Sequence, residues 1–309
     1  MNRSRLILGI GELLWDLLPG GARLGGAPAN FSVMAGRLGN RAAILSRIGR
    51  DELGQAAMEF LHPLPVDASA IQVDPAHQTG RVTVTLQGGE PLYSIDQPVA
   101  WDFLEPREEW LELAKRAGAL CFGTLAQRSP VSRQTIQTLV ANSSSECIRI
   151  FDANLRAPFY SSEVIQESIE LATVLKMSDA ETLEVMKPLG LERSGPSARS
   201  GLRSAAERLL DVFPSLQLVA ITRGSRGSLL VSRQGWNDHP GFAVEVADPV
   251  GAGDAFAAAL AHYMLRGASL AQLNEAGNRW GAWVASQPGA MPDLPDELRL
   301  SIAAAVESY

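Results

Sequence analysis

From Glu105 onwards, the sequence alternates between segments with apolar residues at helical spacing and short apolar runs typical of buried strands. Helices are predicted over 110–117, 131–140 and 164–172, and strands over 119–122, 148–151, 173–177 and 218–221. Such alternation builds βαβ units, whose strands run parallel and whose crossovers place helices against the sheet. The pattern therefore predicts an α/β fold in which a parallel sheet is covered by helices on both faces.

Three of the predicted strands are followed by polar residues. They are Asp152, Asn154 and Arg156 after the strand 148–151, Ser178, Asp179 and Glu181 after 173–177, and Thr222, Arg223 and Gly224 after 218–221. The carboxyl ends of parallel strands meet at one edge of a sheet, where open α/β folds bind their ligands. Each group alone is compatible with turn chemistry, since Asp, Asn and Ser favour turns. Their coincidence indicates a functional site at this edge.

Residues 248–254 read Asp-Pro-Val-Gly-Ala-Gly-Asp and lead into an alanine-rich segment with helical periodicity. The turn from Gly251 to Gly253 is predicted to open a buried helix, whose first N–H groups have no acceptor within the helix. Because the side chains of Gly251, Ala252 and Gly253 are small, a phosphate can approach these groups closely. A carboxylate at Asp254 would repel the phosphate, which indicates a base for the attacking group. Alternatively, Asp254 only caps the helix.

The first apolar run, residues 5–10, is predicted to be a buried strand. Glu12 and Asp16 follow it and are candidate ligand residues by their position at a strand end. The segment 42–48 is predicted to be a further strand, and 187–204 has the composition of an exposed loop before a helix over 202–212.

The segment 24–30 reads Leu-Gly-Gly-Ala-Pro-Ala-Asn. Pro28 suits the first turn of a helix, so Gly25, Gly26 and Asn30 are predicted to lie around a helix entrance. Asn30 is either a ligand-binding residue or a structural amide, and the two preceding glycines favour the first.

Between residues 79 and 102 the pattern changes to two alternating strands, 81–86 and 91–95, joined by a turn. Together with residues 15–24, they are predicted to form a small sheet outside the main body, which suits a lid. Tyr93, Trp101 and Phe103 are then candidates for its apolar underside above a substrate, although such aromatic residues more often serve packing.

The chain has 309 residues, 46% of them hydrophobic, and is predicted to fold as one large α/β domain. Its net charge of −7 provides no basic surface for nucleic acid or anionic membrane. Only three of the 27 basic residues are lysines, and no Gly-x4-Gly-Lys-Ser/Thr motif occurs, so phosphate binding is expected to rely on backbone amides and arginine.

Cys121 and Cys147 each lie in an apolar run and are predicted to be core thiols, which fits a reducing cytoplasm. The N-terminal apolar run is too short for a secretory signal, and no run approaches the length of a membrane span. A cytoplasmic protein is therefore expected.

Several of these motifs together resemble the ribokinase-like, or PfkB-type, family of carbohydrate kinases, almost from end to end. The matching segments are Leu24-Gly-Gly-Ala-Pro-Ala-Asn30, Phe151-Asp-Ala-Asn-Leu-Arg156, Ile221-Thr-Arg-Gly-Ser-Arg-Gly227 and Asp248-Pro-Val-Gly-Ala-Gly-Asp254. Within the family, the segments 11–19, 99–102 and 121–127 are most similar to bacterial fructokinases. The resemblance implies a three-layer α/β fold with a mostly parallel central sheet and a small β lid formed by about 13–25 and 79–103.

The resemblance also implies ATP and Mg²⁺ as cofactor and metal, and phosphoryl transfer to a sugar hydroxyl. Asp254 would be the base in contact with the sugar, Gly251 to Gly253 the anion hole, and Arg156 a cation near the transferred phosphate. The remaining implied contacts divide into a sugar group and a nucleotide group. The sugar group is Asp16, Gly25, Gly26 and Asn30, with Tyr93 and Phe103 from the lid, and the nucleotide group is Ser178, Thr222, Gly224, Gly227 and Asn278.

One departure from the family pattern concerns the metal. Relatives usually have Asn-x-x-Glu where this chain has Ser178-Asp-Ala-Glu181. Glu181 would support Mg²⁺ through water, while the shorter serine is expected to leave a gap beside it. Many relatives are also activated by a monovalent cation such as K⁺, for which Asp248 and the 288–290 loop are candidate ligands.

The resulting expectation is an ATP-dependent fructokinase. The alternatives are a related kinase for ribose, 2-keto-3-deoxygluconate or a nucleoside, and a non-catalytic sugar or nucleotide sensor, against which the presence of Asp254 argues. The expected partners are a small sugar and ATP, without nucleic acid or membrane, and the lid is a candidate surface for a homodimer.

Overall fold

The computed structural model describes residues 6–18, 20–87, 90–191 and 198–308, with side chains except those of 84–87, 90–93 and 198–200. Its main sheet has the strand order β14-β13-β12-β11-β10-β9-β1-β4. The strands from β12 to β4 in this order run parallel, while β13 is antiparallel to β12 and β14 to β13. Their bounds are β1 Leu6–Ile10, β4 Arg41–Leu45, β9 Ala117–Gly123, β10 Ile148–Asp152, β11 Val174–Ser178, β12 Leu218–Thr222, β13 Ser228–Ser232 and β14 Gly235–His239.

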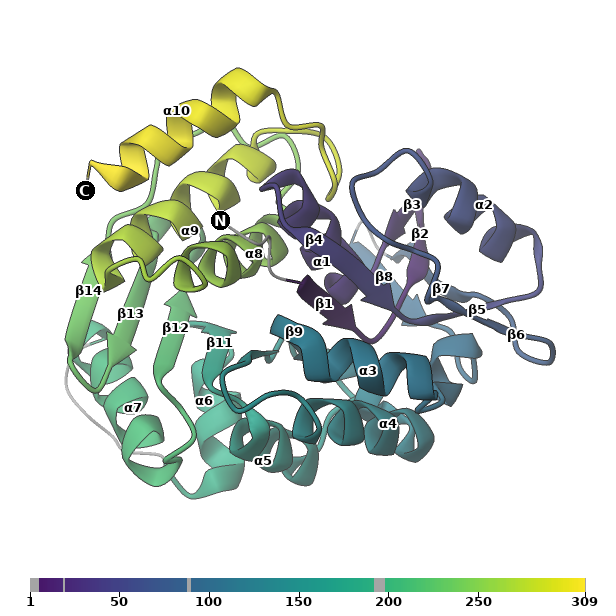
Figure 1. Cartoon of the computed structure of the whole chain (residues 1–309), viewed down its shortest axis with the longest axis horizontal. Helices are drawn as coiled ribbons and strands as arrows, with labels where there is room; N and C mark the ends of the chain where they lie inside the picture. The colour runs from purple at the N-terminus through teal and green to yellow at the C-terminus, as the bar shows by residue number, and fades with distance from the viewer. Residues whose placement is uncertain (1–5, 19, 88–89, 192–197, 309) are drawn as a thin grey trace.

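Helices cover both faces of this sheet, as the alternating pattern predicts (Figure 1). One layer contains α1 (Ala27–Arg37), α8 (Ala252–Met264), α9 (Leu270–Ala285) and α10 (Asp296–Glu307). The other contains α3 (Glu108–Arg116), α4 (Pro130–Ala141), α5 (Ser162–Leu171), α6 (Thr182–Met186) and α7 (Ala198–Val212). Two separate apolar clusters fill the spaces between the sheet and these layers. The expected three-layer architecture is confirmed.

Helix α1 lies unusually close to strand β1. A Cβ atom added to Gly9 would lie 2.1 Å from the carbonyl oxygen of Pro28 and 2.3 Å from Oγ of Ser32, so only glycine allows this approach. Pro28 occupies the first turn of α1, as predicted. The close contact fixes the start of α1 beside the carboxyl end of β1.

The predicted hairpin is present, and it belongs to a four-stranded sheet with the order β3-β2-β7-β8. Its strands are β2 (Leu14–Leu18), β3 (Gly21–Gly25), β7 (Gly80–Gln87) and β8 (Glu90–Ile95). The pairs β2/β3 and β7/β8 are antiparallel, and the parallel pair β2/β7 joins them. This small sheet lies at one end of the main sheet, away from α9 and α10 (Figure 1).

Two predicted segments are wrong in detail. The segment 42–48 is not one strand, because β4 ends at Leu45 and β5 (Arg47–Gly49) pairs instead with β6 (Gln72–Asp74) beside α2 (Glu52–Leu61). The predicted loop 187–204 contains a 3-10 helix at Lys187–Leu189, and α7 begins already at Ala198. Residues 192–197 of that loop lie outside the described ranges. Within the described residues, no helix is long and apolar enough to cross a membrane.

Candidate active site

The polar residues that follow the parallel strands lie at one edge of the main sheet. Their side chains are linked across neighbouring strands: Lys176 of β11 bonds Asp152 of β10, and Glu181 after β11 bonds the backbone of Leu155 after β10. The first turn of α8 joins this edge, because a Cβ on Gly253 would lie 3.1 Å from Nζ of Lys176. Asn30 of α1 donates a hydrogen bond to Asp254 in the same turn. The sequence-predicted grouping of strand ends is therefore present in the structure.

Asp254 is a buried carboxyl group in the first turn of α8. Its Oδ2 accepts a hydrogen bond of 2.8 Å from Nδ2 of Asn30, and 9% of the residue is exposed. The N-cap of α8 is Gly251, and no side chain caps this helix, so the alternative that Asp254 serves as the cap is wrong. Burial, reinforced by Asp152, raises the pKa of Asp254 to about 6, against the opposing influence of Lys176, Asn30 and Arg156. A carboxyl group with this pKa can gain and lose a proton near neutral pH.

Lys176 forms a buried ion pair beneath the first turn of α8. Its Nζ lies 2.9 and 2.8 Å from the two carboxylate oxygens of Asp152, and both side chains are less than a tenth exposed. Burial lowers the pKa of Lys176, but Asp152 and the nearby Asp254 outweigh it, and the net pKa is raised. A Cβ atom added to Gly253 would lie only 3.1 Å from this Nζ. A protonated amine therefore lies directly behind Gly253.

The turn before α8 has the properties of a phosphate cradle. Gly251 adopts φ 82°, and a Cβ there would lie 2.6 Å from the carbonyl oxygen of Ala290, so both its conformation and its surroundings require glycine. Among the described residues, the N–H of Gly253 has no acceptor, and Ala252 beside it presents only a methyl group. The donors at this helix N-terminus therefore fit the phosphates of ATP.

The residues expected to hold the sugar lie next to Asp254 and around the entrance of α1. Gly26 adopts φ 108°, and a Cβ there would lie 2.4 Å from the carbonyl oxygen of Glu12. Oδ2 of Asp16 would lie 2.8 Å from a Cβ on Gly25, so the Asp16 carboxylate covers this glycine. Oδ1 of Asn30 is buried and accepts no hydrogen bond within the described chain, which leaves it available to a hydroxyl group.

Glu12 adds a second buried carboxyl group that the motif comparison left without a role. Its Oε1 accepts the N–H of Ala27 at 3.3 Å, and its Oε2 is buried without a partner among the described residues. Burial and the neighbouring Asp254 raise the pKa of Glu12 to about 7, opposed by its backbone hydrogen bonds and by Arg156. Glu12 therefore supports the N-terminus of α1 from the connection between β1 and β2, since the cap residue Gly26 has no side chain to do so.

Arg156 is the exposed cation of the site. The preceding Asn154 adopts the left-handed conformation with φ 37°, which turns the loop after β10. The charge of Arg156 counteracts the burial that raises the pKa of Asp16 and of Asp254. Among the residues that the structure describes, its guanidinium donates only to the carbonyl oxygen of Leu155, at 3.2 Å, so it has further donors for a phosphate.

Glu181 organises the loops after β10 and β11. Its carboxylate accepts the N–H of Leu155 at 2.6 Å, the N–H of Ser178 at 2.7 Å and the Ser178 hydroxyl at 2.8 Å. Ser178 therefore bonds directly to the Glu181 carboxylate. Within the described residues, no group of three acidic, cysteine or histidine side chains could hold a metal ion.

The expected nucleotide residues lie beside Ser178, around the end of β12. Thr222 pairs with Ser178 across the sheet, and Gly224 and Gly227 adopt φ 59° and 78°. A Cβ on Gly227 would lie 2.0 Å from the carbonyl oxygen of His239. Nδ2 of Asn278 donates to Oγ of Ser228 and to the carbonyl oxygen of Asn274, both at 2.7 Å, which ties α9 to the strand after Gly227.

The aromatic residues expected beneath the small sheet have different surroundings. The ring of Phe103 stacks on His77 with centroids 3.7 Å apart, and Trp101 is completely buried with the Arg128 guanidinium 3.9 Å from its ring centroid. Trp101 therefore serves packing. The side chain of Tyr93 lies outside the described part of the structure.

Asp248, the candidate ligand of a monovalent cation, forms an ion pair with Arg23 of β3. Its Oδ1 also accepts the N–H of Val250 at 3.0 Å, and its Oδ2 that of Gly289 at 3.2 Å. Sequence reasoning missed both Arg23 and Lys176. For Lys176 a signal existed, because a lysine inside an apolar strand requires a buried partner.

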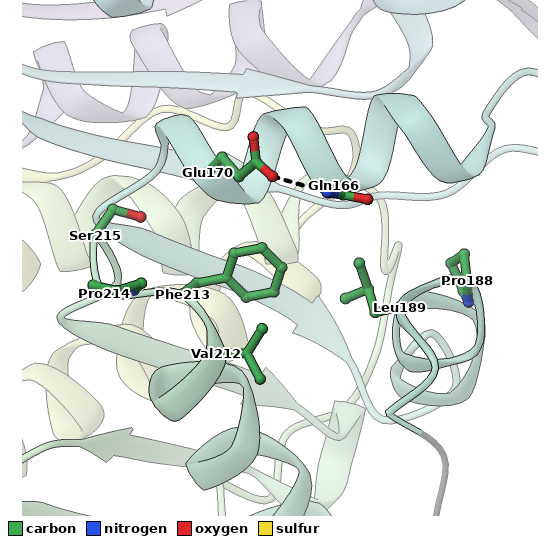
Figure 2. A pocket seen from close by; sticks show the side chains of 8 residues that line it. All are labelled: Gln166, Glu170, Pro188, Leu189, Val212, Phe213, Pro214 and Ser215. Carbon is green, nitrogen blue, oxygen red and sulfur yellow. Dashed lines mark hydrogen bonds between the residues drawn. The ribbon is translucent and has the colours of Figure 1, made fainter.

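A surface pocket of about 510 Å³ lies at the opposite edge of the sheet (Figure 2). Residues 213–215, which line it, precede β12, whereas the site residue Thr222 is the last residue of that strand. The other lining residues come from α5, the 3-10 helix at Lys187–Leu189 and the end of α7. This pocket is therefore separate from the candidate active site.

Comparisons with known proteins agree with this architecture. Residues 21–297 match the family model described as pfkB family carbohydrate kinase. A putative sugar kinase from Pyrococcus horikoshii is 30% identical over 304 residues, which cover 92% of this chain and 91% of the relative. Fructokinase-1 from Oryza sativa subsp. japonica is 28% identical over 323 residues, which cover 97% of each chain.

Solved structures show the same relationship. The crystal structure of the Pyrococcus horikoshii sugar kinase has a TM-score of 0.81 at 30% identity, covering 97% of this chain and 99% of that chain. A fructokinase double mutant from Vibrio cholerae O395, in fructose, ADP and potassium ion bound form, has a TM-score of 0.77 at 26% identity, covering 97% and 98%. The fold is thus that of the ribokinase-like kinases. The chain belongs to the pfkB family of carbohydrate kinases and is an ATP-dependent sugar kinase.

Proposed function

We propose that this kinase transfers the γ-phosphoryl group of ATP to a hydroxyl group of a small sugar, with fructose as the first candidate. The observation that carries the proposal is the buried Asp254, held by Asn30, in the same helical turn as the glycine cradle. The fructokinases among the relatives, and the Vibrio cholerae enzyme with fructose and ADP, support the choice of sugar.

In this reaction Asp254 acts as the general base. As the sugar hydroxyl oxygen forms a bond to the γ-phosphorus, its proton passes to the Asp254 carboxylate, and the bond from the γ-phosphorus to the bridging oxygen breaks to release ADP. Asn30 fixes the carboxylate and offers its own Oδ1 to a second hydroxyl. Asp16 accepts further sugar hydroxyls, while Gly25 and Gly26 leave room for the ring.

The transferred phosphate requires positive charge or hydrogen-bond donors close to its negatively charged oxygens. The N–H groups of the Gly251 to Gly253 turn provide donors, and the ammonium group of Lys176, paired with Asp152, lies behind Gly253. Arg156 reaches the site from the loop after β10 and binds the same group. ATP supplies the phosphoryl group, and Glu181 would help to hold Mg²⁺, which would supply positive charge to the phosphates.

The nucleotide is proposed to lie along the end of β12, next to Thr222, Gly224, Gly227 and Asn278. We further propose one domain over residues 1–309, with the small sheet, about 13–25 and 79–103, as a lid over the sugar. The same sheet would be the contact surface if two copies associate, which a measurement of molecular mass in solution would decide. A cytoplasmic location remains part of the proposal.

A coupled assay of ADP release across a panel of sugars tests the substrate. Fructose is expected to give the highest kcat/KM, and a preference for ribose, 2-keto-3-deoxygluconate or a nucleoside would assign the enzyme to one of those substrates instead. No ADP release with any of them, combined with measurable sugar or ATP binding, would indicate a sensor.

Asp254→Asn tests the base. Because a positioned base typically contributes ~10²–10⁴-fold, turnover should fall by at least that factor while sugar and ATP still bind in calorimetry. Asp296→Asn, on the exposed start of the remote helix α10, is the matched control and should keep full activity. Loss of binding of both ligands by Asp254→Asn would contradict the role of base.

A further inference from the structure

The ion pair between Arg23 and Asp248 joins two parts of the molecule that are 225 residues apart in sequence. Arg23 lies on β3 of the small sheet, where its backbone partner across the sheet is Asp16. Asp248 lies in the loop that leads to the phosphate cradle. The Arg23 side chain is 51% exposed and that of Asp248 only 12%, so the cation reaches from solvent onto a largely buried carboxylate.

Asp248 is a junction between the two loops that shape the cradle. Its own N–H bonds the carbonyl oxygen of Ala285 at the end of α9, and its carboxylate accepts the N–H groups of Val250 and Gly289. The loop after Gly289 in turn packs on the cradle, since a Cβ on Gly251 would lie 2.6 Å from the carbonyl oxygen of Ala290. Any change at the Asp248 carboxylate therefore reaches the conformation of Gly251.

The same carboxylate is where a monovalent cation would bind. Three donors already occupy it, one of them the Arg23 guanidinium. A K⁺ ion on this carboxylate would lie within a few ångströms of the guanidinium, where two positive charges repel each other strongly. Among the described residues, Asp248 acts electrostatically on the neighbouring Asp16. Burial and the charge of Asp248 raise the pKa of Asp16, against the opposing charge of Arg156. The residues present therefore fit the guanidinium and not an additional K⁺ ion.

We propose that Arg23 supplies, from the small sheet, the positive charge at Asp248 that a monovalent cation would otherwise supply. The phosphate cradle is then ordered by the position of the small sheet and not by K⁺. This inference rests on the proposed function, because the cradle matters only if it receives the phosphate of ATP. Arg23 is a positioning residue: it acts on the cradle through Asp248.

The first test compares K⁺ with tetramethylammonium, a cation too large for the site, at constant ionic strength. Melting temperature and ADP release of the wild type should be the same in both salts. Arg23→Gln should lose at least tenfold in turnover in tetramethylammonium, and K⁺ should restore most of it and raise the melting temperature of this variant alone. Arg23→Lys, which keeps the charge, should behave as the wild type.

Two controls make the result specific. Arg299→Gln removes a remote surface ion pair and should show no response to K⁺. Hydrogen exchange at residues 247–253 should increase in Arg23→Gln without K⁺, and Asp248→Asn should produce the same increase with no further effect of Arg23→Gln in the double variant. Melting temperature and exchange need no turnover, so they decide the inference even if the sugar substrate is wrong.

The inference is overturned if K⁺ activates the wild type severalfold and raises its melting temperature, since the ion would then displace Arg23. It is equally overturned if Arg23→Gln matches the wild type in both salts by every measurement.

Discussion

A buried carboxylate is costly to keep charged, and Asp254 shows how the surrounding residues set that cost. Its burial and the charge of Asp152 favour the protonated form, whereas Lys176, Asn30 and Arg156 favour the ionised form. The balance leaves the pKa at about 6 instead of the ordinary 3.8. A carboxyl group with this pKa can gain and lose a proton near neutral pH, as the proposed role of base requires.

This pKa predicts how the rate depends on pH. Below pH 6 the carboxyl group of Asp254 is protonated and cannot act as a base, so kcat/KM should fall about tenfold per pH unit. Lys176→Met combined with Asp152→Asn removes both members of the ion pair and so leaves no unpaired buried charge. The two residues act on the pKa of Asp254 in opposite directions, so the pH at which kcat/KM begins to fall should move by less than one unit. The rates are measured from pH 4.5 to 8. A kcat/KM of the wild type that stays constant down to pH 4.5 would contradict the assignment.

The same pKa has an effect on stability with a definite sign. A carboxyl group whose pKa is higher in the folded state than in the unfolded state binds more protons when folded, so its contribution to the free energy of unfolding decreases as pH rises from about 4 to 6. Asp254→Asn removes the buried charge and should stabilise the fold at pH 7.5 by up to ~2–3 kcal/mol. At pH 4 the variant and the wild type should unfold at the same urea concentration, and a constant difference at both pH values would contradict this explanation.

At the scale of the elements, the sequence predicted the starts of α1 and α8 because local chemistry determines them. Pro28 occupies the first turn of α1, and Gly251 must be glycine because of both its φ and the nearby Ala290. The segment 42–48 was mispredicted because its division depends on β6, a pairing partner from residues 72–74 that no local pattern reveals. The buried pair Lys176 and Asp152 depends in the same way on the register of β10 against β11.

The cradle glycines should differ in their importance for stability. Alanine at Gly251 must adopt φ 82° and meets backbone atoms of Ala290 at 2.6–2.7 Å, so Gly251→Ala should lower the free energy of unfolding by ~2–4 kcal/mol. Alanine at Gly253 meets only the tip of Lys176 at 3.1 Å, and Gly253→Ala should cost below ~1 kcal/mol while still impairing phosphate transfer.

Gly267→Ala is the matched control for conformation alone, because Gly267 has φ 74° and no atom within 4 Å of an added Cβ. It should cost ~1–2 kcal/mol, between the two cradle variants. Urea unfolding of the three variants measures this order. Equal destabilisation by Gly251→Ala and Gly253→Ala would mean that the contact with Ala290 can relax.

At the scale of the whole molecule, the site is assembled from both the main sheet and the small sheet. Asp254, Lys176 and Glu181 belong to the helices and strand ends of the main body, whereas Asp16 and Arg23 belong to the small sheet. The three-layer body was predictable from the alternating pattern. The contribution of Arg23 was not, because an exposed arginine on a strand carries no local sign of a partner 225 residues away.

This arrangement predicts that sugar binding steadies the small sheet. The β7/β8 hairpin extends beyond the parallel pairing of β2 with β7, which ends at Leu17 and Thr83, so its outer part is a two-stranded ribbon. Such a ribbon alone is marginally stable and opens readily. When the sheet closes on a sugar held by Asp16 and Asn30, hydrogen exchange at residues 80–95 should slow at least severalfold, more with fructose and nucleotide together than with either alone.

Strand β10, in the middle of the main sheet, provides the internal reference and should not change. If exchange over 80–95 stays constant at saturating fructose and nucleotide while ADP release is intact, the small sheet is a fixed part of the scaffold, and the proposed lid movement is wrong.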